Sequence, residues 1–148
     1  MFKHLLVTLD GSPRSEAVIP HAIDLAKSMK SEITLLRIVD APASDWSERG
    51  AMGKAHVETT AGALMLAHAR EYLERVAGML QQSGVQVHTM VEEGAPARRI
   101  IAASHEVDAD AIAMATHSRR GLGRLMFGSV AEAVLHEASV PVLLVRAA

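Results

Sequence analysis

The residues best placed to do chemistry lie in a basic, glycine-containing stretch near the end of the chain. Residues Ala111–Ser129 read AIAMATHSRRGLGRLMFGS. A short apolar run ends at small polar residues, a loop with three arginines follows, and a helical pattern begins at Gly128-Ser129. Helix starts attract anions, and glycines allow close approach of the backbone to a ligand. The stretch therefore indicates an anion site, most simply for phosphate; a solvated connecting loop is the alternative.

A carboxylate follows the first apolar run of the chain. Residues His4–Leu9 end at the turn sequence Asp10-Gly11-Ser12-Pro13. A carboxylate at a strand end can bond ligand hydroxyls or bind Mg²⁺ through oxygen. It can equally form an Asx turn with its own backbone. Asp10 is therefore a candidate contact for a ligand, and a purely structural role in the turn is the alternative.

Other chemistries find no support in the sequence. The chain has no cysteine, which excludes disulfides and thiolate catalysis. None of its eight histidines forms an HxxxH or HExxH pair, so a zinc site has no local signal. The serines near the loops, Ser12 and Ser118, lack the G-x-S-x-G elbow of a nucleophile.

Length and composition describe an ordinary globular protein. The 148 residues fit one domain, 49% are hydrophobic, and the net charge of −2 gives no reason to expect nucleic acid as a partner. Aromatic residues make up only 3%, so aliphatic side chains and eight methionines must fill the core. With no signal peptide and no membrane-length apolar run, we expect a cytoplasmic protein.

The elements that must position these residues alternate between strand and helix patterns. The spacing of apolar residues predicts strands at His4–Leu9, Ile33–Val39, Val85–Val91, Ala111–Ala115 and Val140–Val145, and helices at Ser15–Met29, Thr60–Gln82, Ala97–His105 and Ser129–Glu137. Pro20 is expected to kink the first helix, Ala41–Thr59 reads as a long irregular loop, and the alternation in Val85–Val91 suggests a sheet edge.

This order predicts an α/β fold with a parallel sheet and helices on both faces. Open sheets of this kind bind ligands beyond the carboxyl ends of their strands, where the strand order reverses. The Asp10 loop and the Thr116–Ser129 loop would then meet at one crevice. The fold pattern therefore strengthens the prediction of an anion site.

Three segments together resemble the universal stress protein family, the UspA-like domain. They are LLVTLDGSPRSEAVIPHAIDLA, EEGAPARRIIAAS and MATHSRRGLGRLMFGSVAEAVLHEASVPVLLV, and the resemblance covers the whole chain. It implies a three-layer α/β/α, Rossmann-like fold of the adenine nucleotide alpha hydrolase type, with five parallel strands in the order 3-2-1-4-5. It also implies a role in the stress response, and one branch of the family binds ATP.

The nucleotide motif of that branch, G-x-x-G-x9-G-[ST], fits the spacing here but not every residue. Its first two glycines fall at Ala115 and Ser118, the spacer at Arg119–Phe127, and the final pair at Gly128-Ser129. Alanine and serine are small, yet each adds a Cβ where the motif has none. The two replacements weaken the expectation of ATP binding.

The resemblance implies a role for each site residue. Asp10 would contact the ribose or the metal ion, and Ile38 would border the adenine. The ribose and the first phosphate would be lined by Met114, Ala115 and Thr116. The polyphosphate would be held by Ser118, Arg119, Gly128, Ser129 and Val130. Leu9 is a further candidate binding residue. Ser129 could also act as the N-cap of the last helix.

Two functions remain open. The first is a sensor or regulator that binds ATP, or another adenine nucleotide, with Mg²⁺; no residue qualifies as a base for rapid hydrolysis, so any turnover should be slow. The second is a nucleotide-free, dimeric interaction protein of the UspA type. In either case the apolar strand Val140–Val145 would be a sheet edge, which invites pairing with a second copy and predicts a homodimer.

Overall fold

Five parallel strands form the central layer, in the order β3-β2-β1-β4-β5. The computed structural model describes residues 2–39, 61–117 and 128–147. The strands are β1 (His4–Thr8), β2 (Glu32–Val39), β3 (Val87–Glu93), β4 (Ala111–His117) and β5 (Val142–Ala147). The helices are the 3₁₀ turn η1 (Ser15–Ala17), α1 (Val18–Met29), α4 (Ala61–Gln82), α5 (Pro96–Glu106) and α6 (Ser129–Glu137). The predicted fold class and strand order are confirmed.

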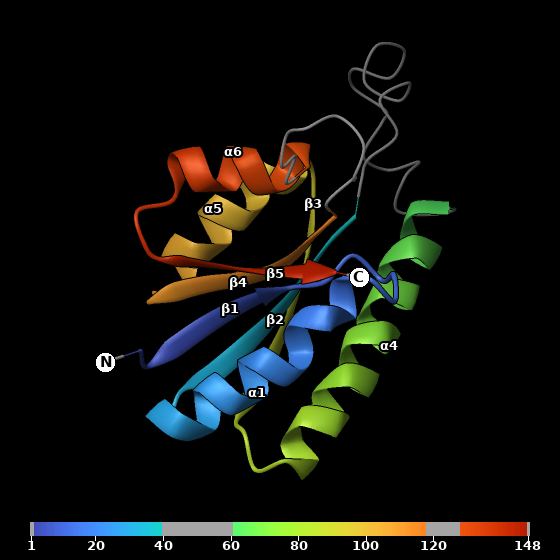
Figure 1. Ribbon diagram of the computed structural model, residues 1–148. Coiled ribbons are helices and arrows are strands. Elements are labelled where there is room, and N and C mark those ends of the chain that lie inside the picture. Colours follow the sequence, from blue (N-terminus) through green and yellow to red (C-terminus); the bar gives the residue numbers. More distant parts are fainter. Residues whose placement is uncertain (1, 40–60, 118–127, 148) are drawn as a thin grey trace.

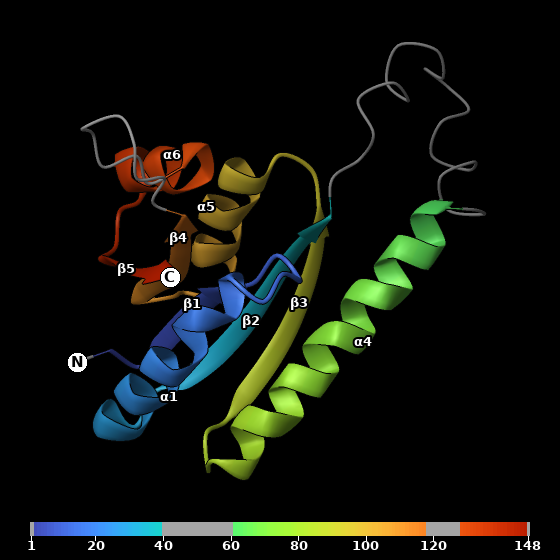
Figure 2. The same ribbon diagram turned by 45° about the vertical axis from the view of Figure 1, so that its right-hand side comes forward.

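Two helical layers cover the sheet, one on each face (Figures 1 and 2). Helices α1 and α4 lie on one side, and α5 and α6 lie on the other. The central strand β1 supplies both cores, because alternate side chains of a strand point to opposite faces. Leu5 and Val7 are buried in the cluster under α1 and α4, while Leu6 is buried in the cluster under α5 and α6.

Helix α4 is held by one apolar stripe. Leu73, Val76, Ala77 and Leu80 are buried at helical spacing, as the sequence predicts. The predicted stripe also includes Leu64 and Ala67, and this part of the prediction is wrong, because both are exposed. The prediction that the methionines fill the core is wrong for Met29, Met65 and Met79, which are 36%, 42% and 55% exposed, whereas Met114 is buried. Among the described residues, no helix is both long and apolar enough to span a membrane.

Some predicted boundaries are wrong, for local reasons. The third strand begins at Val87 instead of Val85, because the Val85 N–H donates to the Leu80 carbonyl in the turn that ends α4. The last strand is Val142–Ala147 instead of Val140–Val145, because Pro141 has no N–H to give the ladder. The first helix starts as a 3₁₀ turn.

Pro20 does not break α1. It is the third residue of the helix, where backbone N–H groups have no intrahelical acceptor, so the missing N–H costs no helical hydrogen bond. The edge position predicted for the third strand is confirmed. Its alternation is only partly followed, because Thr89 is exposed although Val87 and Val91 on the same face pack against the core.

The carboxylate of Asp110 fastens the start of β1 to the start of β4. It accepts the N–H groups of Lys3 at 2.6 Å and of His4 at 2.9 Å. These hydrogen bonds hold the pKa of the Asp110 carboxyl below its usual value of 3.8. The ionised form is therefore stabilised by folding, and its contribution disappears as pH falls through the folded pKa.

We expect Asp110→Asn to lower the free energy of unfolding at pH 7, because the amide accepts these hydrogen bonds less strongly. The difference between variant and wild type should shrink as pH falls below the usual value of 3.8, because the carboxyl of the unfolded chain takes up its proton first, and it should disappear below the lowered pKa of the folded carboxyl. Urea unfolding at pH 7 and at pH 3 measures both quantities. A difference of the same size at the two pH values would contradict this expectation.

Candidate functional site

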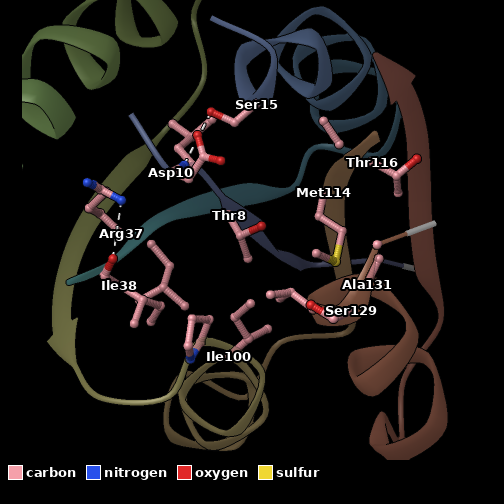
Figure 3. Close-up of a pocket in the computed structure, with 16 residues that line it drawn as sticks. Thr8, Asp10, Ser15, Arg37, Ile38, Ile100, Met114, Thr116, Ser129 and Ala131 are labelled. Atoms are coloured by element: carbon pink, nitrogen blue, oxygen red, sulfur yellow. Dashed lines mark hydrogen bonds between the residues drawn. The ribbon is translucent and has the colours of Figure 1, made fainter. Parts of the chain in front are cut away.

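A cavity of about 380 Å³ opens at the carboxyl ends of the strands (Figure 3). This volume lies within the usual range for small-molecule sites. The ends of β1, β2 and β4 and the first turns of α5 and α6 surround it. Its lining residues are Thr8, Leu9, Asp10, Ser15, Leu36, Arg37, Ile38, Pro96, Ile100, Met114, Ala115, Thr116, Gly128, Ser129, Val130 and Ala131.

Asp10 is the acidic group of the cavity. Its Oδ1 accepts the Ser12 N–H at 2.8 Å, and its own N–H donates to Ser15 Oγ at 3.2 Å. Burial opposes ionisation of Asp10, but the hydrogen bonds from Ser12 and Ser15 and the charge of Arg37 outweigh it and lower the pKa of the carboxyl. The side chain is thus an oriented carboxylate at neutral pH. The predicted Asx turn is present, and it leaves Asp10 on the cavity wall.

Arg37 brings a positive charge to the same wall. It stands at the end of β2, between Leu36 and Ile38, and its Nη1 donates to the Ile38 carbonyl at 3.2 Å (Figure 3). The guanidinium also lies against the backbone of Gly11, where an added Cβ would stand 3.5 Å from Nη2. Gly11 has a φ of +88°, which suits glycine. The cation therefore supports the Asp10 loop from the neighbouring strand.

The start of α6 forms the opposite side of the cavity. Gly128 is its N-cap, with φ +87° and ψ 152°, a conformation that only glycine adopts without strain. The prediction of Ser129 as N-cap is wrong, since Ser129 is already the first helical residue. The first N–H groups of a helix lack intrahelical acceptors and carry partial positive charge, so this side suits an anion.

Between these two polar sides lies an apolar surface. Leu36, Ile100 and Met114 are at most 5% exposed, and Ile38 is half-buried beside them. Thr8 lies beside this surface, and Thr116 lies beyond Met114, away from Ile38 and Ile100 (Figure 3). An apolar wall flanked by a carboxylate and by a helix start can take a flat ring together with polar and anionic groups.

The structure brings together nine of the eleven residues that the sequence singles out: Leu9, Asp10, Ile38, Met114, Ala115, Thr116, Gly128, Ser129 and Val130. Ser118 and Arg119 lie outside the described residues, as do Arg120, Arg124 and the predicted loop Ala41–Thr59. Their contacts with a ligand stay predictions.

Sequence reasoning missed several lining residues. Arg37 carried a signal, because a charged residue in the middle of an otherwise apolar strand needs an explanation. Pro96 and Ile100 also carried one, since they follow the carboxyl end of a neighbouring parallel strand. Thr8, Ser15, Leu36 and Ala131 have no distinctive signal and are placed by the fold alone.

The sequence profile of the universal stress protein family matches residues 1–146. The chain belongs to this family. A universal stress protein of Methanocaldococcus jannaschii, MJ0531, is 34% identical over 146 residues, which are 99% of this chain and 83% of the relative.

Solved structures of universal stress proteins share the fold. UspA from Lactobacillus plantarum aligns over 98% of both chains with a TM-score of 0.79 at 21% identity. The universal stress protein from Archaeoglobus fulgidus in complex with dAMP aligns over 97% of both chains, with a TM-score of 0.66 at 20% identity.

Among the described residues that line the cavity, Asp10 is the carboxylate that could hold Mg²⁺. Asp10 is the acidic residue of the cavity lining, and no group of three His, Asp and Glu side chains within the described residues could hold a metal ion. One carboxylate is compatible with Mg²⁺ that also binds phosphate oxygens and water, which is its usual arrangement in nucleotide sites.

Proposed function

We propose that the protein binds an adenine nucleotide, ATP with Mg²⁺, in this cavity and acts as a sensor or regulator in the stress response. One observation carries the proposal: a carboxylate, an apolar wall and a helix start line the same cavity. The apolar wall of Ile38, Ile100 and Met114 suits the base. The α6 start suits the phosphates, and Asp10 suits the ribose or the metal ion.

The dAMP complex of the related Archaeoglobus protein supports an adenine nucleotide as the ligand class. The intact Gly128-Ser129 pair supports a phosphate site at α6. No residue of the described lining is a clear base for water attack on a phosphate, so we expect at most slow hydrolysis.

A nucleotide-free interaction protein is the second candidate. Ala115 lines the cavity at a position where the motif has glycine, and its Cβ narrows the approach to the backbone. Calorimetric titration of the purified protein with ATP and Mg²⁺ separates the two functions. We expect saturable heat; no heat at millimolar ATP would remove the first proposal and favour the second.

We further propose a homodimer through β5. This strand is an edge of the sheet, and Leu143 on it is 39% exposed. An apolar edge strand with unpaired backbone groups favours pairing with a second copy around a two-fold axis.

Light scattering at micromolar concentration should give a dimeric mass for the wild type. Leu143→Lys should shift the protein to the monomer, because it puts a charge into the expected contact. Leu64→Lys is a matched control, since Leu64 is 58% exposed on α4, away from β5. It should remain dimeric. A monomeric wild type would overturn the proposed dimer.

A further inference from the structure

Arg37 brings hydrogen-bond donors to the cavity from the end of β2, and the proposed function gives it no contact with the ligand. It lines the cavity together with Leu36 and Ile38, its apolar neighbours along the strand. In Figure 3 it lies beside Ile38 and across the cavity from Ser129. Arg37 therefore stands at the end proposed for the base, away from the phosphates.

The guanidinium group of Arg37 is already oriented by two contacts. An added Cβ at Gly11 would stand 3.5 Å from Nη2 and 3.6 Å from both Cζ and Nε. Nearly equal distances to three atoms of a planar group place Gly11 over the face of that plane. Nη1 also donates to the Ile38 carbonyl at 3.2 Å. The face of the group is thus covered by the loop, whereas its N–H groups project from the edge.

The Ile38 carbonyl points into the space beyond the end of β1. The Leu36 carbonyl accepts the Leu9 N–H at 2.9 Å on the β1 side, and the Val39 carbonyl accepts the Gly94 N–H at 3.1 Å on the β3 side. Because the carbonyls of a parallel strand alternate between its two neighbours, that of Ile38 faces the β1 side. The pairing of β1 with β2 ends at Leu36, so this carbonyl lies past the ladder and at the cavity.

A donor and an acceptor therefore lie side by side at this wall. Nη1 of Arg37 carries two hydrogens and the Ile38 oxygen accepts two hydrogen bonds, so their mutual bond leaves one position free on each. Adenine has the complementary edge, because its 6-amino donor is next to the ring acceptor N1. A 6-oxopurine has the opposite edge, with an acceptor at position 6 and a donor at N1.

We propose that Arg37 determines specificity for adenine: its guanidinium donates to N1 of the base, beside the Ile38 carbonyl, which accepts the 6-amino group. Inosine triphosphate would set its oxygen against the carbonyl and its N1–H against the guanidinium. Mismatched groups in a closed site lose their hydrogen bonds without replacement, so they are rejected more strongly than a missing contact. This inference rests on the proposed nucleotide binding.

The first test is calorimetry of wild type and Arg37→Met with Mg-ATP and Mg-inosine triphosphate. Methionine keeps an unbranched stem beside Gly11 and removes the donors. We expect wild type to prefer ATP by at least about tenfold. In Arg37→Met, ATP should bind about fivefold more weakly and inosine triphosphate should not, so the preference falls by that factor. Equal weakening of both nucleotides would assign Arg37 a purely structural role and overturn the inference.

A ligand change at one atom identifies the group that Arg37 contacts. In 1-deaza-ATP a C–H replaces N1, so wild type should bind it about fivefold more weakly than ATP. Arg37→Met should bind the two ligands equally, because the interaction is already absent. The same preference for ATP in both proteins would mean that another group contacts N1 and would overturn the inference. The wild-type comparison needs no variant, and equal affinity there would also overturn it.

Arg99→Met is the matched control. Arg99 also donates to a backbone carbonyl at the end of a strand, from Nε to Glu93 at 2.7 Å, but it does not line the cavity. Its affinities for all three nucleotides should equal those of wild type. No heat with wild type and ATP would overturn the proposed function and this inference together. ATP binding without a preference over inosine triphosphate would overturn the inference alone.

Discussion

Replacing Gly128 with valine is expected to weaken nucleotide binding by about 10- to 100-fold. Gly128 has a φ of +87° at the N-cap of α6, where a β-branched residue is strained. No atom of the described structure stands within 4 Å of the added Cβ, so the effect comes from backbone strain and from the approach to the ligand. Either the first N–H groups of α6 turn away from the phosphates, or the side chain occupies their place.

Gly84→Val is the matched control for this variant. Gly84 has a φ of +89°, and an added Cβ there also meets nothing within 4 Å, but the residue follows α4 at the opposite end of the sheet. Both variants should lose about 1–3 kcal/mol of stability. Calorimetry should show loss of binding only for Gly128→Val, and the milder alanine variants should follow the same order. Binding by Gly128→Val as tight as by wild type would mean that the phosphates lie elsewhere.

Truncation of Leu80 to alanine is expected to lower the free energy of unfolding by about 2–5 kcal/mol. The side chain is fully buried between α4 and the sheet, and its removal leaves a cavity. The backbone carbonyl of Leu80 accepts the N–H groups of Ser83 and Val85, and alanine keeps these bonds. The loss therefore measures packing alone.

Met79→Ala provides the comparison at the preceding position of the same helix. Its side chain is 55% exposed, and alanine is a good helix former, so the change in stability should stay within about 0.5 kcal/mol. Urea unfolding monitored by circular dichroism measures both variants. Equal losses would contradict the burial of the α4 stripe.

Much of the fold could be predicted because its patterns are local. Buried strands such as β1 read as short apolar runs, and α4 reads as a stripe at helical spacing. The errors occur where a hydrogen bond to a residue outside the segment, or a residue without an N–H, decides where a strand begins. Val85 belongs to the turn after α4 because of its hydrogen bond to Leu80, and Pro141 delays β5 because it has no N–H. The strand order followed from the resemblance to a family, not from periodicity.

The candidate site, too, could be predicted from the sequence only in part. Asp10 and Gly128 could be singled out because their residue types are unusual at the ends of strands and the starts of helices. The position of Ile100 depends on how α5 crosses the sheet.

The central position of β1 has a consequence for how binding and unfolding are linked. Its side chains enter both cores, and the chain continues from its last residue, Thr8, through Leu9 to Asp10. A molecule that has lost either helical layer would lose the support of this strand and, with it, the ligand site. Only fully folded molecules would then bind, and a saturating nucleotide would protect the whole domain from proteolysis, in proportion to ligand concentration over Kd.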